Sequence, residues 1–512
     1  MLAQVTSGAV LGIDACIVRV EVDLASGLPC MNVVGLAESA VREGRERVLA
    51  ALHNSGLAVP PRRITINLAP ADMPKHGSAF DLPISLGILA ASGAVPVDAL
   101  TGVCVVGELG LDGEVRPVRG ALSLALACGA AGIRTFCVPH ANAREAAEVD
   151  GVRVLAARTL EEVVRHLRGD HPLPRAERAP AATDDAPGLD LVDVKGQAYA
   201  RRALEIAAAG QHNMLLIGPP GSGKSMLARR LPGILPPLAR SEALEVTRLQ
   251  SSVGRLPAGA GLVVRRPFRA PHHSISEAGL VGGGTFPRPG EVSLAHCGVL
   301  FLDELPEFRR SALESLRQPL EDGEVHIGRA SGGVRFPAAF MLVAAMNPCP
   351  CGFFGFGTGQ CICHAGMIAR YRARISGPLL DRIDLHVDVP ALQPRELREQ
   401  QGGETTAVVQ ARVHAARARQ VARLGCDGPG TTANARMTVR QLRAHCRLDA
   451  AGETLLHEAS RRLALSARAY HRVLRLARTI ADLAGEDHIS AVHLAEAIQY
   501  RALDRPVPVS GY

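Results

Sequence analysis

The chain has 512 residues, of which 47% are hydrophobic and 3% aromatic, with no tryptophan and a net charge of +7. This length suits about three domains with aliphatic cores. The sequence contains no run of 18 apolar residues, and residues 1–23 lack a basic leader, so we expect neither a membrane span nor a secretory signal. Eight of the twelve cysteines are scattered singly, which is not typical of a secreted disulfide framework. We therefore expect a cytoplasmic protein.

Residues 1–168 alternate between strand-like and helix-like patterns. Val18, Val20 and Val22 alternate with charged residues, which predicts a strand. Further strands are predicted at 64–68, 103–106 and 135–138, and helices at 41–53 and 82–91. This order predicts an α+β domain. Residues 169–188 are rich in proline, alanine and charge without a period, and we interpret them as a linker.

Three segments of this first domain resemble the proteolytic domain of Lon-type proteases: 74–81, 107–113 and 115–120. A Ser–Lys dyad would require a lysine after the third segment. No lysine occurs between Lys75 and Lys195, and Ala79 stands where the nucleophile belongs. The resemblance therefore implies a Lon-like fold without proteolytic chemistry.

Residues 213–230 carry the clearest functional signal. A short apolar run, 213–217, precedes a segment that fits G-x-x-x-x-G-K-[ST], and good helix formers follow. The eight residues of this segment are Gly218, Pro219, Pro220, Gly221, Ser222, Gly223, Lys224 and Ser225. Glycines allow backbone N–H groups to turn toward phosphate oxygens, and the helix N-terminus adds positive charge. We expect ATP in this loop, with Lys224 on the β and γ phosphates and Ser225 on Mg²⁺.

Two further apolar runs end in polar residues that suit ATP hydrolysis. Residues 299–302 lead into Asp303 and Glu304, about 80 residues after the phosphate loop. This arrangement predicts that Asp303 belongs to the Mg²⁺ shell and that Glu304 activates the attacking water. Residues 340–346 end at Asn347, which either contacts the γ-phosphate or begins the turn before Pro348.

Two arginines and a basic C-terminal segment leave alternatives open. Arg382 is flanked by acids, so it forms a structural ion pair or reaches a neighbouring subunit's ATP. Residues 396–512 are predicted to be helical, with one helix from Ser466 to Leu483 that carries Arg468 either toward the nucleotide or on a solvated face. Residues 401–512 hold 16 arginines against 10 acids, which suggests a polyanionic partner or an arginine-rich coding bias.

Four cysteines predict a zinc site. Cys349, Cys351, Cys361 and Cys363 form two C-x-C pairs in a loop rich in glycine and phenylalanine. Four thiolates complete a tetrahedral zinc shell and stabilise a loop with little core of its own. His364 is an alternative ligand, and free or redox-active thiols are the alternative interpretation. Phe353, Phe354 and Phe356 beside them either stack on bases or are buried.

Together these residues resemble AAA+ ATPases of the helix-2-insert group, and most closely the magnesium-chelatase-like ComM/YifB family. The resemblance rests on the motifs above and on segments 32–36, 271–274, 290–296, 347–352 and 477–483. It implies an α/β P-loop core at 189–395, a Lon-like domain at 1–168 and a helical lid at 396–512. It makes Asn347 sensor 1, Arg382 the arginine finger and Arg468 sensor 2. It also places an insert near 272–284 and a hairpin near 324–335 at the pore of a ring.

The family resemblance further implies a function on DNA. We expect a homo-hexameric ring that drives branch migration in recombination and natural transformation. Single-stranded, forked or branched DNA would be bound independently of sequence, with Arg329 and Arg335 following the phosphates. The alternatives are a chelatase-like metal-insertion chaperone, against which the N-terminal domain argues, and a protein unfoldase that feeds a separate protease.

Overall fold

The structure of the protein is a computed structural model. The structure describes residues 1–35, 39–71, 75, 77–178, 189–284, 287–328, 333–355, 360–392, 403–425, 432–463 and 465–501. The chain forms two compact units, an N-terminal unit of residues 1–183 and 243–263, and a C-terminal unit of residues 184–242 and 264–512. Residues 243–263 thus pack with the N-terminal unit, although the sequence analysis placed them in the nucleotide module.

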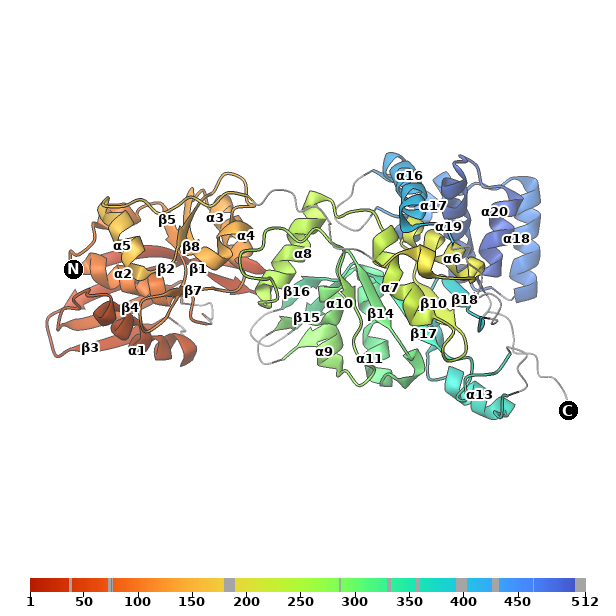
Figure 1. The fold of residues 1–512 in the computed structure, drawn as a ribbon, viewed down its shortest axis with the longest axis horizontal. Helices are drawn as coiled ribbons and strands as arrows, with labels where there is room; N and C mark the ends of the chain where they lie inside the picture. Colours follow the sequence, from red (N-terminus) through yellow and green to blue (C-terminus); the bar gives the residue numbers. More distant parts are fainter. Residues whose placement is uncertain are drawn as a thin grey trace. The chain divides into compact units, whose positions relative to one another are not determined.

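A seven-stranded mixed sheet organises the N-terminal unit, in the order β3-β4-β2-β1-β5-β8-β9 (Figure 1). Its strands are β1 (Leu2–Leu11), β2 (Asp14–Ala25), β3 (Cys30–Val34), β4 (Arg63–Ala69), β5 (Val103–Val105), β8 (Thr135–Pro139) and β9 (Arg153–Ala157). β1, β2 and β4 pair antiparallel, whereas β5, β8 and β9 continue the sheet as parallel strands. Val18, Val20 and Val22 of β2 are fully buried, which confirms the predicted alternation.

Helices and short elements complete this unit. They are α1 (Ser39–Asn54), α2 (Asp81–Ala91), α3 (Ala121–Ala130), α4 (Ala143–Ala146), α5 (Leu160–Arg168), the 3-10 helices η1 (Val97–Leu100) and η2 (His140–Asn142), and the hairpin strands β6 (Glu108–Leu109) and β7 (Val115–Arg116). Every residue of α2 is buried, in agreement with its continuous apolar sequence.

Part of the helix α8 (Arg240–Ser252) belongs to the same unit. Arg248 donates to the carboxylate of Asp14 at 2.6 Å, and the Ser251 carbonyl accepts from the Gly120 N–H at 3.2 Å. The start of the predicted linker also packs here, because the Ala156 N–H donates to the Pro174 carbonyl at 3.0 Å. The remaining linker residues, 179–188, lie outside the described residues.

A five-stranded parallel sheet organises the C-terminal unit, in the order β11-β14-β17-β10-β18. Its strands are β10 (Met214–Ile217), β11 (Phe268–Arg269), β14 (Val299–Leu302), β17 (Met341–Met346) and β18 (Leu385–Asp388). Every residue of β10, β14 and β17 is buried, as expected for parallel strands that are covered on both faces. This sheet confirms the α/β class and the three strands predicted around the phosphate loop.

Helices surround the sheet, and two small hairpins project from it. These elements are α6 (Ala198–Gly210), α7 (Lys224–Ile234), α9 (Glu277–Val281), β12 (Gly282–Gly283), β13 (Arg288–Pro289), α10 (Glu291–Leu294), α11 (Arg310–Ser315), α12 (Arg317–Asp322), β15 (Glu324–Ile327), β16 (Val334–Pro337), α13 (Ala365–Arg372) and α14 (Gly377–Leu380), with η3 (Leu191–Asp193) and η4 (Leu305–Glu307). The two hairpins adjoin, since a Cβ at Gly282 would lie 3.0 Å from Ile327 Cδ1.

The C-terminal helices pack beside α6, where Figure 1 draws them in blue. They are α16 (Thr406–Leu424), α17 (Val439–His445), α18 (Ala450–Leu463), α19 (Ala467–Ala484) and α20 (Ala491–Gln499), with η5 (Asn434–Arg436). The Ser466 side chain caps α19 by accepting from the Ala469 N–H at 3.2 Å, as the sequence predicts. Among the described residues, no helix combines the length and the apolar character that crossing a membrane requires.

A buried carboxylate links these helices. Asp482 of α19 has a side chain with no exposed area, and it accepts from Arg423 at 2.5 Å, Arg478 at 3.2 Å and Asn434 at 2.8 Å. Asn434 also donates to Thr479, whose hydroxyl lies 2.8 Å from His212 before β10. Because a buried charge is stable only when paired, this network determines how the helices meet the sheet.

We expect Asp482→Asn to lower the free energy of unfolding by about 3 kcal/mol, because the buried guanidinium of Arg478 and the half-buried guanidinium of Arg423 lose their carboxylate partner. Asp487→Asn is the matched control, since Asp487 pairs with Arg419 at 2.8 Å on the surface and its side chain is 86% exposed. That change is expected to cost less than about 1 kcal/mol. Urea denaturation followed by circular dichroism checks both values, and equal losses would contradict the role of Asp482.

Candidate functional site

The phosphate loop connects β10 to α7 as the sequence predicts. β10 ends at Ile217, and α7 begins at Lys224. Gly221 and Gly223 adopt positive φ angles of 75° and 90°, which favour glycine. Gly218 is required for a different reason, because a Cβ there would lie 2.1 Å from the carbonyl oxygen of Val389. The loop therefore presents its backbone N–H groups at the amino end of a helix.

Lys224 lies inside this loop. Its Nζ donates to the carbonyl oxygens of Gly218 and Pro219, both at 2.8 Å, and to Asn347 Oδ1 at 3.3 Å. The residue is 9% exposed, and burial lowers the pKa of its ammonium group. The structure thus brings the predicted sensor, Asn347 at the end of β17, to the predicted phosphate-binding lysine.

Ser225 and Asp303 come together across the site. The Ser225 hydroxyl donates to Asp303 Oδ2 at 2.6 Å, and Asp303 follows the last residue of β14. A hydroxyl and a carboxylate are the oxygen ligands that Mg²⁺ prefers. The pair therefore fits the magnesium role that the sequence assigned to it.

Glu304 has a strained backbone and an unpredicted partner. Its φ is +53°, a region that non-glycine residues rarely adopt. Its carboxylate lies 3.1 Å from His273 Nδ1, and its side chain is 58% exposed. His273 follows β11, the strand beside β14, and its ring meets Phe308 edge-on. In the sequence, His273 belongs to the family segment 271–274, and no local pattern links it to Glu304.

Arg382 and Arg468 lie at the other edge of the sheet. Asn213, Phe340 and Asp384 directly precede β10, β17 and β18, and they line one cavity of about 540 Å³ with both arginines. The other arginines in its lining are Arg436, Arg472 and Arg475. The phosphate loop follows the carboxyl end of β10. A four-residue strand at about 3.3 Å per residue separates the two edges by roughly 13 Å.

Arg382 is held within its own chain in the described structure. It forms an ion pair with Glu321 and donates to the Pro378 carbonyl at 2.5 Å, while its buried Nε has no hydrogen-bond partner among the described residues. Arg468 is exposed near the start of α19. Arg472, one turn further on, pairs with Asp384 at 3.0 Å. The structure thus places the two predicted arginines together, away from the phosphate loop of the same chain.

The four cysteines converge as predicted. Their Sγ atoms all lie within 4.8 Å of one another, with Cys349 fully buried and the other three half-buried. Cys349 Sγ is 3.3 Å from Cys351 Sγ and 3.8 Å from Cys361 Sγ. A backbone hydrogen bond at Phe353 lowers the pKa of the Cys351 thiol to about 6. Four thiols at these separations fit one tetrahedral ion such as Zn²⁺.

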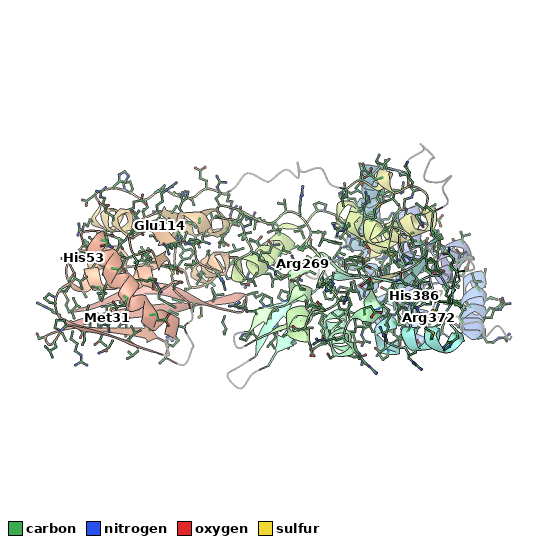
Figure 2. The ribbon with its side chains drawn as sticks, turned by 60° about the horizontal axis from the view of Figure 1, so that its bottom comes forward. Met31, His53, Glu114, Arg269, Arg372 and His386 are labelled. Carbon is green, nitrogen blue, oxygen red and sulfur yellow. The ribbon has the colours of Figure 1, made fainter. Side chains whose placement is uncertain are left out.

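Of the two arginines predicted to contact DNA, only Arg335 is among the described residues. Arg335 on β16 is 70% exposed and lies 3.5 Å from Glu324 on β15. Arg329 and Phe356 lie outside the described residues. Phe354 packs under the guanidinium of Arg372, which Figure 2 labels, at 5.8 Å from the ring centre.

The Lon-like segments form no Ser–Lys pair among the described residues. Lys75 is fully buried, and its Nζ donates to the Pro70 carbonyl. The Ser78 hydroxyl donates instead to the carboxylate of Glu108. The absence of proteolytic chemistry remains a prediction.

Comparison with known proteins identifies the family. "Magnesium chelatase, subunit ChlI" matches residues 190–397, "Subunit ChlI of Mg-chelatase" matches 20–142, and "Magnesium chelatase, subunit ChlI C-terminal" matches 403–501. "Competence protein ComM" of Haemophilus influenzae is 46% identical over 509 residues, and "Uncharacterized protein YifB" of Salmonella typhimurium is 45% identical over 509 residues, with 98% of each chain covered in both cases. "Lon protease 2" of Bacillus subtilis is 26% identical over 176 residues, which cover 31% of this chain and 30% of that protein. The chain therefore belongs to the magnesium-chelatase-like ComM/YifB family.

Proposed function

We propose that this protein is a ring-forming AAA+ ATPase that couples ATP hydrolysis to DNA remodelling, as a branch-migration helicase in recombination or natural transformation. The observation that carries the ATPase assignment is the convergence of Lys224, Ser225, Asp303, Glu304 and Asn347 at one sheet edge. Family membership supports ATP and Mg²⁺ as the cofactors.

Each residue of this group has a separate task in hydrolysis. The Lys224 ammonium group would leave the loop carbonyls to which it donates and bind the β and γ phosphates instead. Burial strengthens the electrostatic attraction between the ammonium group and the phosphates. Ser225 and Asp303 hold Mg²⁺, which neutralises phosphate charge when bound. Glu304 orients the attacking water and takes its proton. His273 fixes the Glu304 carboxylate, and Asn347 contacts the γ-phosphate from β17.

The position of the arginine cavity supports assembly into a ring, which we propose is a homo-hexamer. Arg382 and Arg468 lie at the sheet edge opposite the phosphate loop, so a second subunit would have to supply the ATP they contact. An arginine that reaches the transferred phosphate stabilises the charge that develops on it. We therefore assign Arg382 as the finger and Arg468 as the lid sensor for a neighbouring subunit's nucleotide.

Action on DNA is supported by the relative whose name associates it with competence and by the exposed Arg335 on the β15–β16 hairpin. An arginine on a hairpin contacts phosphates without reading bases, which suits movement along any sequence. The alternative functions are those of a chelatase-like metal-insertion chaperone and of a protein unfoldase, and the response of the ATPase to DNA, porphyrin and unfolded protein distinguishes them.

We expect Glu304→Gln to retain ATP binding and to lose turnover by a factor of about 100 or more, because the water loses its base. Lys224→Ala is expected to weaken ATP binding itself. A coupled phosphate-release assay and titration with a fluorescent ATP analogue check the two effects. Undiminished turnover in the Glu304→Gln protein would overturn the catalytic assignment.

We expect Arg382→Ala to reduce turnover about a thousandfold if Arg382 acts between subunits. Mixing this variant with Glu304→Gln should restore part of the activity at interfaces that combine an intact Glu304 with an intact Arg382. Glu321→Ala is the control, since it breaks the ion pair with Arg382 but keeps the guanidinium. An equal loss in both variants would favour a purely structural ion pair.

We expect forked and single-stranded DNA to bind independently of sequence, with affinity that falls steeply as salt rises. Joint replacement of Arg329 and Arg335 by alanine should abolish strand displacement while basal ATPase stays near normal. Arg116→Ala is the control, because Arg116 is also an exposed arginine near a glutamate, at 3.6 Å from Glu114. Stimulation of ATPase by porphyrin or unfolded protein, without stimulation by DNA, would replace the helicase proposal.

A further inference from the structure

The loop that carries the four cysteines, residues 349–363, meets the phosphate loop at Gly352. It begins two residues after Asn347, whose side chain contacts Lys224 at 3.3 Å. At Gly352 it meets the phosphate loop again, since a Cβ on Gly352 would lie 2.6 Å from Cδ and 3.0 Å from Cγ of Pro220. No real Cβ fits at such a distance, so the absence of a side chain at Gly352 is what allows the two loops to touch.

The glycine that makes this contact lies in one turn with the first two cysteines. The Gly352 N–H donates to the Cys349 carbonyl at 3.0 Å, which closes a turn between the first two cysteines. Gly352 has a φ of +90°, a conformation that glycine adopts without strain. The turn that touches Pro220 is therefore part of the loop that presents the Cys349 and Cys351 sulfurs.

The described part of the cysteine loop consists of residues 349–355 and 360–363. Its described residues form no helix or strand, and Ile362 is 87% exposed. From α13, Arg372 donates to the Pro348 carbonyl at 3.4 Å and packs on Phe354. A loop with so little apolar burial depends on cross-links for its shape, and a thiolate-bound metal ion provides them.

We propose that one zinc ion bound by Cys349, Cys351, Cys361 and Cys363 supports the phosphate loop through the Gly352–Pro220 contact, so that metal occupancy sets the affinity for ATP. This inference rests on the proposed ATPase function. Binding exchanges each thiol proton for a Zn–S bond, and the protons go to solvent. Gly352 is a positioning residue, because it would act on ATP binding only through Pro220 of the phosphate loop.

Two glycine variants separate this contact from general damage to the loop. Gly352→Ala places a methyl group against Pro220. Gly355→Ala is the matched control, because Gly355 has a similar φ of +84° but a methyl group added there would have none of the described residues within 4 Å. Both changes place alanine at a positive φ angle and so impose the same kind of backbone strain. Only the Gly352→Ala methyl group would clash with Pro220 of the phosphate loop.

The experiment measures zinc content and the affinity for a fluorescent ATP analogue on the full-length protein. We expect about one zinc per chain, its loss in Cys349→Ser, and ATP affinity at least about tenfold weaker after removal of zinc by a chelator that spares Mg²⁺. Zinc addition should restore the affinity. Gly352→Ala should keep zinc and bind ATP about tenfold more weakly, whereas Gly355→Ala should match the parent protein.

Three results would overturn the inference: a parent protein that neither contains nor takes up zinc, unchanged ATP affinity after zinc removal, or equal ATP affinity in the two glycine variants. If Gly352→Ala fails to fold, removal and return of zinc in the parent protein still decide the matter. A parent protein that binds no ATP in either metal state would refute the proposed ATPase function instead, so the two failures are distinguishable.

Discussion

The shared direction of the five strands in the C-terminal unit is the constraint on which the candidate site depends. In a parallel sheet, every strand contributes its carboxyl end to the same edge, so the segments after β10, β14 and β17 meet there. Lys224, Asp303 and Asn347 follow those strands and converge although they are far apart in sequence. The same rule carries the residues before the strands, Arg382 among them, to the opposite edge, about one strand length from the phosphate loop of the same chain.

Buried carboxylates position the helix that carries Arg468, one of the two predicted arginines in the cavity. Asp384 precedes β18 and pairs with Arg472, and Asp482, near the C-terminal end of α19, pairs with Arg423 and Arg478. These ion pairs hold α19 against the sheet and α16. The start of α19 is left exposed, and Arg468 is there, beside the cavity that also contains Arg382. Packing at one end of a helix thus decides where a charge at the other end is presented.

Glu304 and the phosphate loop each contact an element outside the sheet. Glu304 meets His273, which precedes α9 and the β12–β13 hairpin, and that hairpin adjoins β15. Pro220 meets Gly352 of the cysteine loop. In both cases a residue of the candidate ATP site lies against a segment with its own proposed ligand, DNA for the hairpins and a metal ion for the cysteines. Contacts of this kind are the physical route by which the proposed ligands would act on the candidate ATP site.

Features that arise locally could be predicted from the amino-acid sequence. Apolar runs predicted β10, β14 and β17, the glycines and Lys224 predicted the phosphate loop, and Ser466 predicted the start of α19, because strand burial, turn geometry and capping depend on neighbouring residues. Four contacts became apparent from the tertiary structure alone. His273 meets Glu304, and Gly352 touches Pro220. Arg382 and Arg468 share a cavity opposite the phosphate loop, and residues 243–263 pack with the N-terminal unit. These contacts join residues that are distant in sequence. They follow from strand order and packing, which no local pattern specifies.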